Sequence, residues 1–312
     1  MVCYTFAARK KRVLKNMNIH YLKAEEIDKT KWNSCVHFAN NGNPFGYMWF
    51  LNNVSKNWDC LIEDDYKSVL PLIWQPKMLK TKELHIPHWA RSTGIYSVNA
   101  LSKKRVDAFL NAIPPEYQNI EMALNEGVNI HDGLDFERTE QQNYHILLNK
   151  DYPSIANDYV EETKDIIVEA ESTSMISIAN LKPEVLADFY KKHTKDDKWV
   201  DKKFHALQRI MYNAMHRGLG FSTGVEDKKG DLLAADFFIF SHGKLMSLIG
   251  TISDEGRKTG AHHMLIDRII QTNATRPIIF DFNTNGKWTE GFGAKPTPYF
   301  HIKRKTGWRK FL

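Results

Sequence analysis

Short apolar runs alternate with helical patterns along the second half of the sequence. Residues 245–252 are apolar or β-branched at most positions, as in a strand covered on both faces. From Ala261 onwards, apolar residues recur every three or four positions, as on a helix that packs against a sheet. Between them, residues 253–260 (SDEGRKTG) predict a basic, glycine-containing loop that opens the helix. Unpaired backbone N–H groups at the start of such a helix favour a phosphate.

The segments around this strand and helix predict a mixed sheet. The expected elements are strands at 174–181, 221–225, 232–241, 245–252, 277–283 and 297–303, and helices at 183–194, 202–217, 261–273 and 287–291. An antiparallel meander is thus joined to a parallel pair of strands by a crossover helix, which predicts an α+β fold.

The first half repeats this order of elements without repeating the residues themselves. We expect strands at 18–22, 59–62, 69–74, 84–89, 119–124 and 143–148, and helices at 25–38, 47–53 and 102–113. The similarity is therefore one of pattern only. It predicts two tandem domains, 17–150 and 151–312, that meet near Pro153. We expect residues 1–16 to be a disordered extension.

Composition narrows the class of protein. The chain of 312 residues is 42% hydrophobic and 26% charged, which is enough to build a core. Its net charge of +6 permits an anionic partner such as a nucleotide or RNA. The three cysteines have no metal-ligand spacing and predict free thiols in a reducing compartment. No apolar run reaches transmembrane length, so we expect a cytoplasmic protein without a membrane span or a bound metal.

Two motifs resemble those of a known superfamily. Residues 257–262 (RKTGAH) are similar to the Arg/Gln-x-x-Gly-x-Gly/Ala motif that holds the acyl-CoA pyrophosphate in GNAT acyltransferases. The match lies at Arg257 and Gly260, and His262 stands where a small residue is usual. The FDFN of 280–283, followed by FGAKPTPYF at 292–300, resembles the ending of FemAB-like tandem GNAT proteins.

This resemblance implies a fold of two tandem GNAT-like domains, each a mixed, mostly antiparallel sheet flanked by helices. The first domain would be degenerate and would shape a cleft with the second. The implied activity is N-acyl transfer from acetyl-CoA or another acyl-CoA to the primary amine of a small molecule or peptide. The residues implied to bind the donor are Arg257, Lys258, Thr259, Gly260, Ala261, His262 and Asn283.

Three residues are candidates for the chemistry of transfer. Asp281 interrupts an apolar strand, where burial would raise its pKa and favour a role as a base, or it caps a neighbouring helix. Asp236 interrupts another apolar strand, either as a functional carboxylate or as a solvent-facing position. Tyr299 could donate to the leaving group or complete the edge of the core. The tyrosine usual in GNAT enzymes is absent, because Lys287 occupies its place.

Two other functions remain open. Fem-type relatives move an amino acid from aminoacyl-tRNA onto a cell-wall precursor, and the net positive charge is compatible with tRNA as a partner. Alternatively, the missing tyrosine and the histidine at 262 mark a binding module that keeps the GNAT fold without its chemistry.

Overall fold

A computed structural model describes residues 17–305, apart from 79–80, 174 and 195–197. The expected extension at residues 1–16 lies outside this range. The first half of the chain contains β1 (Ile19–Lys23), η1 (Ala24–Glu26), α1 (Lys29–Phe38), η2 (Pro44–Gly46), α2 (Met48–Val54), β2 (Trp58–Glu63), β3 (Ser68–Pro76), β4 (Lys82–Leu84), β5 (Tyr96–Ser97), α3 (Lys103–Asn111), β6 (Tyr117–Ala123) and β7 (Glu137–Leu147).

The second half follows the predicted order closely. It contains α4 (Tyr152–Ala156), α5 (Glu161–Ser172), β8 (Ile176–Ala179), α6 (Pro183–His193), α7 (Lys198–His216), β9 (Gly220–Glu226), β10 (Leu232–Ser241), β11 (Lys244–Ile252), α8 (Asp254–Lys258), α9 (Ala261–Asn273), β12 (Ile279–Asp281), η4 (Lys287–Phe292) and β13 (Lys295–Lys305). The predicted meander is β9–β10–β11, and α9 crosses over to the parallel strand β12.

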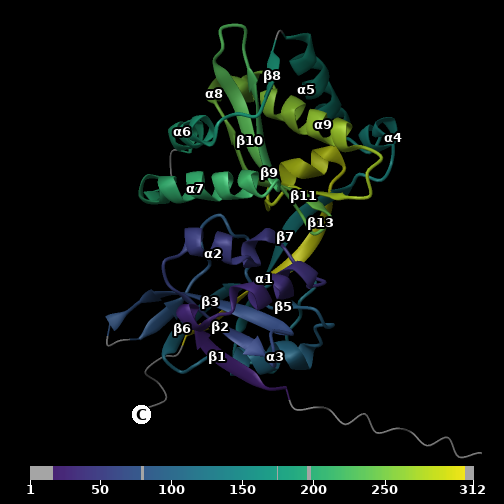
Figure 1. The fold of residues 1–312 in the computed structure, drawn as a ribbon. Coiled ribbons are helices and arrows are strands. Elements are labelled where there is room, and N and C mark those ends of the chain that lie inside the picture. Colours follow the sequence, from purple (N-terminus) through teal and green to yellow (C-terminus); the bar gives the residue numbers. More distant parts are fainter. Residues whose placement is uncertain (1–16, 79–80, 174, 195–197, 306–312) are drawn as a thin grey trace, which may run out of the picture.

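The two halves form two lobes that share one sheet (Figure 1). Its strand order is β1-β2-β3-β4-β6-β13-β7-β12-β11-β10-β9-β8. The last strand of the chain, β13, is therefore inserted between two strands of the first half, β6 and β7. Strand β7 pairs in turn with β12 of the second half. Neither half completes its sheet without the other.

Alternation along β10 explains how one strand serves two cores. Phe238 packs with Met264 and Leu265 of α9 on one face. On the other face, Phe237 and Ile239 pack with apolar side chains of α6 and α7. Successive side chains of a strand point to opposite faces. Because both faces of β10 are covered, the strand is apolar along most of its length. The second core also contains side chains of α2, which joins the lobes through apolar contacts.

Two expectations for individual elements were wrong. The strand predicted at 84–89 ends at Leu84, because Pro87 has no backbone donor and Trp89 adopts a positive φ of 62°. Helix α5 was not expected, since its sequence EETKDIIVEAES is mostly polar. It is nevertheless held by contacts with α9, which bury Ile167 and Ala170.

Candidate functional site

Strands β11 and β12 part after a short parallel contact. They pair only from Lys244 with Ile279 to Met246 with Asp281. The remaining residues of β11 keep their antiparallel bonds to β10 on one side. On the side that faces away from β10, no strand of the described residues lies beside their backbone groups. The two parallel strands therefore part and leave a wedge between them.

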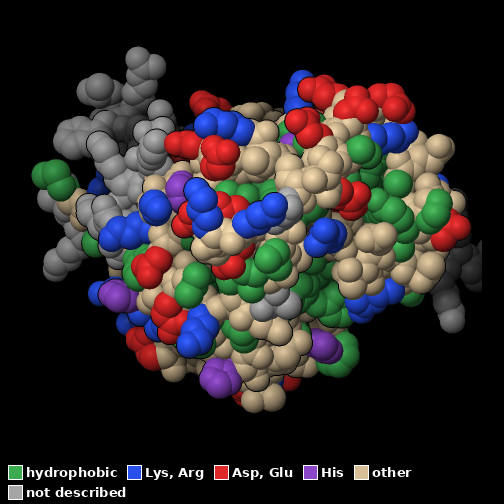
Figure 2. Space-filling view, turned by 90° about the horizontal axis from the view of Figure 1, so that it is seen from above, with side chains coloured by type: hydrophobic (Ala, Val, Ile, Leu, Met, Phe, Trp, Pro, Cys, Tyr) green, Lys and Arg blue, Asp and Glu red, His purple; other side chains and the backbone are tan. Residues whose placement is uncertain are grey.

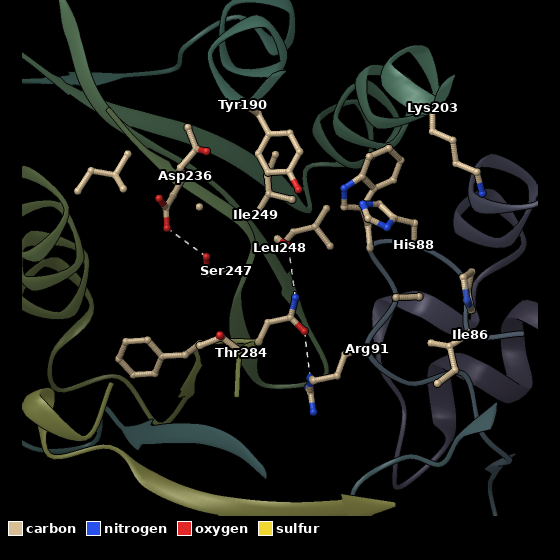
Figure 3. Close-up of a pocket in the computed structure, with 18 of the residues that line it drawn as sticks. Ile86, His88, Arg91, Tyr190, Lys203, Asp236, Ser247, Leu248, Ile249 and Thr284 are labelled. Atoms are coloured by element: carbon tan, nitrogen blue, oxygen red, sulfur yellow. Dashed lines mark hydrogen bonds between the residues drawn. The ribbon is translucent and has the colours of Figure 1, made fainter. Parts of the chain in front are cut away.

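A cavity of about 820 Å³ lies in this wedge and extends to the first lobe (Figure 3). Its walls come from β10 and β11, from the segments after β12 and β4, and from three helices. The lining residues are Gln75, His85, Ile86, Pro87, His88, Trp89, Ala90, Arg91, Tyr190, Lys203, Asp236, Ser247, Leu248, Ile249, Gly250, Thr251, Ile252, His262, Ile266, Phe282, Asn283, Thr284 and Trp288. The first lobe thus shapes a cleft with the second.

A β-bulge shapes β11 where it leaves β12. Phe237 pairs with Ile249 and Phe238 pairs with Ser247, so Leu248 is an extra residue in the ladder. Its carbonyl accepts a hydrogen bond from Nδ2 of Asn283 at 3.3 Å. Asn283 therefore spans the gap between the parting strands and lines the cavity.

Asp236 lies on the floor of the cavity and is fully buried. Its carboxylate bonds Nε2 of His262 at 2.9 Å and accepts from Oγ of Ser247 at 3.1 Å. Burial alone would lower the pKa of His262, but the Asp236 carboxylate outweighs it and raises that pKa. The solvent-facing alternative for Asp236 is wrong, because β10 is covered on both faces. His262, a predicted donor-binding residue, is hydrogen-bonded to Asp236.

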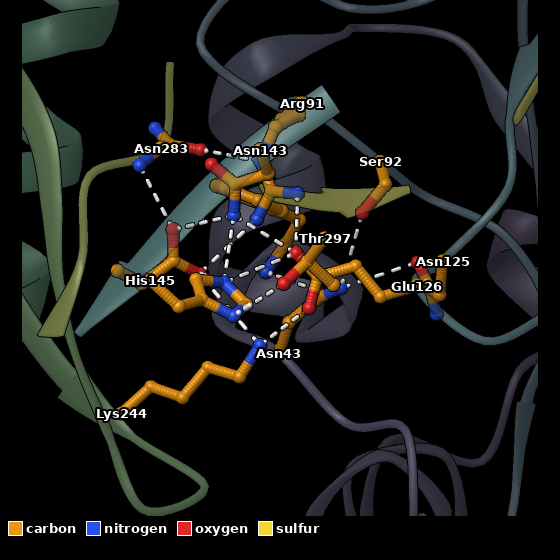
Figure 4. Close-up of polar contacts among 12 residues, drawn as sticks. Asn43, Arg91, Ser92, Asn125, Glu126, Asn143, His145, Lys244, Asn283 and Thr297 are labelled. Carbon is orange, nitrogen blue, oxygen red and sulfur yellow. Dashed lines mark hydrogen bonds and ion pairs between the residues drawn. The ribbon is translucent and has the colours of Figure 1, made fainter. Parts of the chain in front are cut away.

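Asp281 belongs to a polar group that joins the lobes, and Figure 4 draws the contacts of the labelled members of this group. We call this group the interlobe cluster, and its members are Arg91, Glu126, Asn143, His145, Lys244 and Asp281. Arg91 forms ion pairs with Glu126 at 2.8 Å and with Asp281 at 3.2 Å. Asn143 donates to both carboxylates at 2.8 Å, and Lys244 bonds Glu126 at 2.6 Å.

The expectation of a raised pKa for Asp281 was wrong. Burial alone would raise it, but Arg91, His145 and Lys244 hold the pKa of Asp281 well below its usual range. A carboxylate that is fully buried and already bonded to cations is a poor proton acceptor. Glu126, His145 and Asp281 also have the residue types and spacing of a metal site. Arg91 and Lys244, however, already engage both oxygens of Glu126 and Oδ2 of Asp281, and Asn143 donates to Oδ1 of Asp281.

The predicted donor loop is more ordered than expected. Residues 254–258 form α8, and the backbone N–H groups of Gly256, Arg257 and Thr259 are bonded within this turn. Arg257 and Lys258 are exposed and pair with acidic residues of the same helix. No side chain caps α9, so the first backbone N–H groups of that helix remain available to bind a ligand.

The other motif residues at this corner are covered. Gly260 and Ala261 are buried, and Gly260 lies against Ile166 of α5. Thr259 donates its hydroxyl hydrogen to the Glu255 carbonyl. Of the six motif residues 257–262, His262 alone is among the described residues that line the cavity.

Tyr299 is buried on β13, where its ring lies 5.3 Å from the guanidinium of Arg91. Burial raises the pKa of its hydroxyl. Neither Tyr299 nor Asp281 is among the described residues that line the cavity. Both instead contact Arg91, which lines the cavity.

Several site residues come from the first lobe and carried little signal in the sequence. Arg91, in the segment after β4, reaches Asp281 across 190 positions of sequence. Glu126 and His145 have no motif around them. Their contacts depend on the long-range pairing of β6, β13, β7 and β12, which no local pattern reveals.

Comparison with known proteins places this geometry in a fold. No protein-family model matches the sequence, and no curated protein matches it either. The structure is similar to that of FemX, with a TM-score of 0.63 and 12% identity over 91% of this chain and 97% of the other. It is similar to L-PGS from Bacillus licheniformis, with a TM-score of 0.55 and 11% identity over 90% and 93% of the two chains.

A third similar structure is a tandem GNAT protein from the clavulanic acid biosynthesis pathway, determined without AcCoA. Its TM-score is 0.54, with 11% identity over 93% of this chain and 99% of the other. Among the described residues, no helix combines the length and the apolar character needed to cross a membrane.

The three structural similarities show that the chain has the α+β fold of tandem GNAT-like domains that FemAB-like proteins share, as its motifs predicted.

Proposed function

We propose that this protein is an N-acyltransferase that moves an acyl group from an acyl-CoA to a primary amine. The observation that carries the proposal is the Asp236–His262 pair, which faces an 820 Å³ cavity where two parallel strands part. Such a pair beside a deep cavity can accept a proton from a substrate that reacts there.

The edge of β11 supports a donor with an amide-bearing arm. From Ser247 to Ile252, one side of the strand faces the cavity instead of β12. An extended arm such as pantetheine can bond to these backbone groups as an added strand would. The first N–H groups of α9 and the charge of Arg257 would then hold the donor's phosphates.

The proposed reaction needs a neutral amine. His262 takes a proton from the acceptor ammonium, and Asp236 holds the imidazole and stabilises the imidazolium that results. The amine nitrogen then bonds to the thioester carbonyl carbon, the carbon–sulfur bond breaks, and the proton that the nitrogen loses passes to the leaving CoA thiolate. Asn283 would orient the donor arm from the opposite strand.

Aminoacyl-tRNA is the second candidate donor, used by a Fem-type enzyme that acts on a cell-wall precursor. The observation that favours it is the cover that α5 places over Gly260, together with the ion pairs that engage Arg257 and Lys258. The similarity to FemX is compatible with this donor. Figure 2, however, shows basic side chains interspersed with acidic ones on the face it presents, without one continuous basic field.

Calorimetric titration of CoA separates the donors. Wild type should bind CoA, and Arg257→Glu should weaken binding by about tenfold through lost phosphate attraction. Lys229→Glu is the matched control, since it makes the same charge change at an exposed turn between β9 and β10. Equal weak heats for all three proteins would reject the acyl-CoA donor. A steep salt dependence of tRNA binding would then support the second candidate.

Release of free thiol from acetyl-CoA in the presence of amines tests the transfer itself. CoA binding without acceptor-dependent thiol release would reject the enzyme and favour the non-catalytic binding module.

A further inference from the structure

The wall of the cavity opposite Asp236 consists of residues that have no part in the proposed reaction. We call residues 85–91 together with Lys203 the acceptor wall. Figure 3 draws Lys203 and Ile86 on the far side of the cavity from Asp236, with His88 between them and the floor. The first lobe supplies 85–91, and α7 of the second lobe supplies Lys203.

Two buried nitrogen atoms of this wall lack a hydrogen-bond partner among the described residues. They are Nε1 of Trp89 and Nδ1 of His85. Buried polar groups in folded proteins are nearly always bonded, so each exception calls for an explanation such as a missing ligand. Trp89 can only donate at this atom. Burial lowers the pKa of His85, with a contribution from Lys203, which favours the neutral form of its ring.

Trp89, a residue of the acceptor wall, has a strained backbone conformation. Its φ of 62° is a left-handed conformation that large side chains rarely adopt. Such strain persists when the surrounding structure enforces it, and it concentrates at functional sites. The neighbouring Arg91 is held by the interlobe cluster, which fixes the segment against the second lobe.

The charge of the wall is positive. Lys203 lines the cavity and donates to the backbone carbonyl of Val54 at 3.2 Å, and burial lowers its pKa. The cavity's described lining contains one carboxylate, Asp236, which is bonded to His262. The charge of Arg91 is met by Glu126 and Asp281. A ligand that offers negatively charged oxygen to this wall would therefore complement both its charge and its donors.

We propose that the amine acceptor also carries a carboxylate, which binds Nε1 of Trp89 and the ammonium of Lys203 while the amine faces His262. This inference rests on the proposed acyl transfer for the assignment of the amine end. It narrows the acceptor from any primary amine to amino acids and peptides with a free carboxylate.

A length series of probes tests the carboxylate directly, without any donor. Glycine, β-alanine, γ-aminobutyrate, δ-aminovalerate and ε-aminocaproate would be titrated into the full chain. The n-alkylamines of matching length, methylamine to pentylamine, serve as partners that lack only the carboxylate. At least one amino acid should bind about tenfold more tightly than its matched alkylamine, as for a charge-assisted hydrogen bond. If no amino acid exceeds its partner, the inference is overturned.

Two variants place the preference on the wall. Trp89→Phe keeps an aromatic ring but removes the N–H, and Lys203→Met keeps the chain but removes the charge. Each should abolish most of the tenfold preference while the alkylamines bind as before. Arg217→Met is the control, since this cation lies over Trp49 in a separate cavity of about 380 Å³. Retention of the preference in both wall variants would reject the assigned site.

The outcomes also separate this inference from the proposed function. A carboxylate preference without acyl transfer would keep the acceptor wall and reject the reaction. Acyl transfer to amino acids and alkylamines with equal efficiency would keep the reaction and reject the acceptor wall.

Discussion

The carboxylate of Asp236 controls the pKa of His262, the base of the proposed reaction. Because Asp236 raises the pKa of His262, wild-type kcat/KM should rise with pH as the imidazole loses its proton. Asp236→Asn should shift this rise to lower pH and reduce kcat by about 100-fold, as expected for a weakened general base. The measurement is a pH profile of acyl transfer for the two proteins. His262→Gln should remove the rise altogether, and an unchanged profile in both variants would exclude the pair from proton transfer.

His145 makes a second prediction for a single side chain. Burial alone would lower its pKa, but Asp281 and Glu126 raise it above the ordinary value of 6.5. A raised folded-state pKa means that His145 stabilises the fold fully below the unfolded pKa and loses this contribution as pH rises through the folded pKa. His145→Gln should therefore lower the free energy of unfolding more at about pH 5.5 than at about pH 9.

Urea unfolding at the two pH values provides the measurement. His205→Gln, which removes an exposed histidine of α7 outside the interlobe cluster, is the control. The two carboxylates do not confuse the result, because their lowered pKa values keep them ionised across this range. A larger loss at the higher pH would contradict the assignment.

Sequence pattern can single out a candidate residue where its chemistry and the local element coincide. Asp236 interrupts an apolar strand and Asn283 ends one, and both line the cavity as positions in the predicted site. The partnership of Asp236 with His262 was not visible, because it depends on how α9 lies across β10. Arg91 and Glu126 could not be assigned either, since their contacts require two lobes to be placed against each other.

The start of α9 shows how an element depends on one glycine. Gly260 has a φ of 66°, and a Cβ added there would lie 2.7 Å from Cγ2 of Ile166 on α5. Gly260→Ala should therefore lower the free energy of unfolding by about 1 kcal/mol for the left-handed backbone and by a further 1 to 3 kcal/mol or so for the clash. Chemical denaturation measures the sum.

Gly230 offers a matched control for this element. Its φ is also positive, at 84°, but an added Cβ would meet nothing within 4 Å. Gly230→Ala should show only the backbone contribution of about 1 kcal/mol. Adding Ile166→Ala to Gly260→Ala should cause less loss than the two single changes summed. Equal losses for the two glycine variants would show that α5 does not press on this corner.

Elements with a strong period were predictable, and those defined by contacts were not. The apolar run of β10 and the spacing of α9 gave their positions directly, because each must bury a face or stripe. Helix α5 is mostly polar and gains its place from packing on α9. The end of β4 at Leu84 depends on Pro87 and on the strained Trp89, and only the proline was a visible signal.

The exchange of strands between the lobes makes a prediction for the whole molecule. Strand β13 lies between β6 and β7, and β7 also pairs with β12, so each half completes the other's sheet. A fragment of residues 17–150 would lack β13, and a fragment of 151–312 would lack both neighbours of that strand. The apolar core that joins α2 to α6 and α7 would also be cut. We expect neither fragment to melt cooperatively, and we expect the mixed fragments to recover a cooperative transition.

Calorimetry and circular dichroism of each fragment, and of the two combined, would measure this. The control is a full-length chain cleaved at a protease site placed between β7 and α4, where Lys150 and Asp151 are exposed. That chain should stay folded after the cut, because both pieces remain paired through β13. A cooperative transition for 151–312 alone would mean that the second lobe holds its sheet without β7. In that case the second lobe would form its part of the cavity alone, and the first lobe would only add residues 85–91 of the acceptor wall.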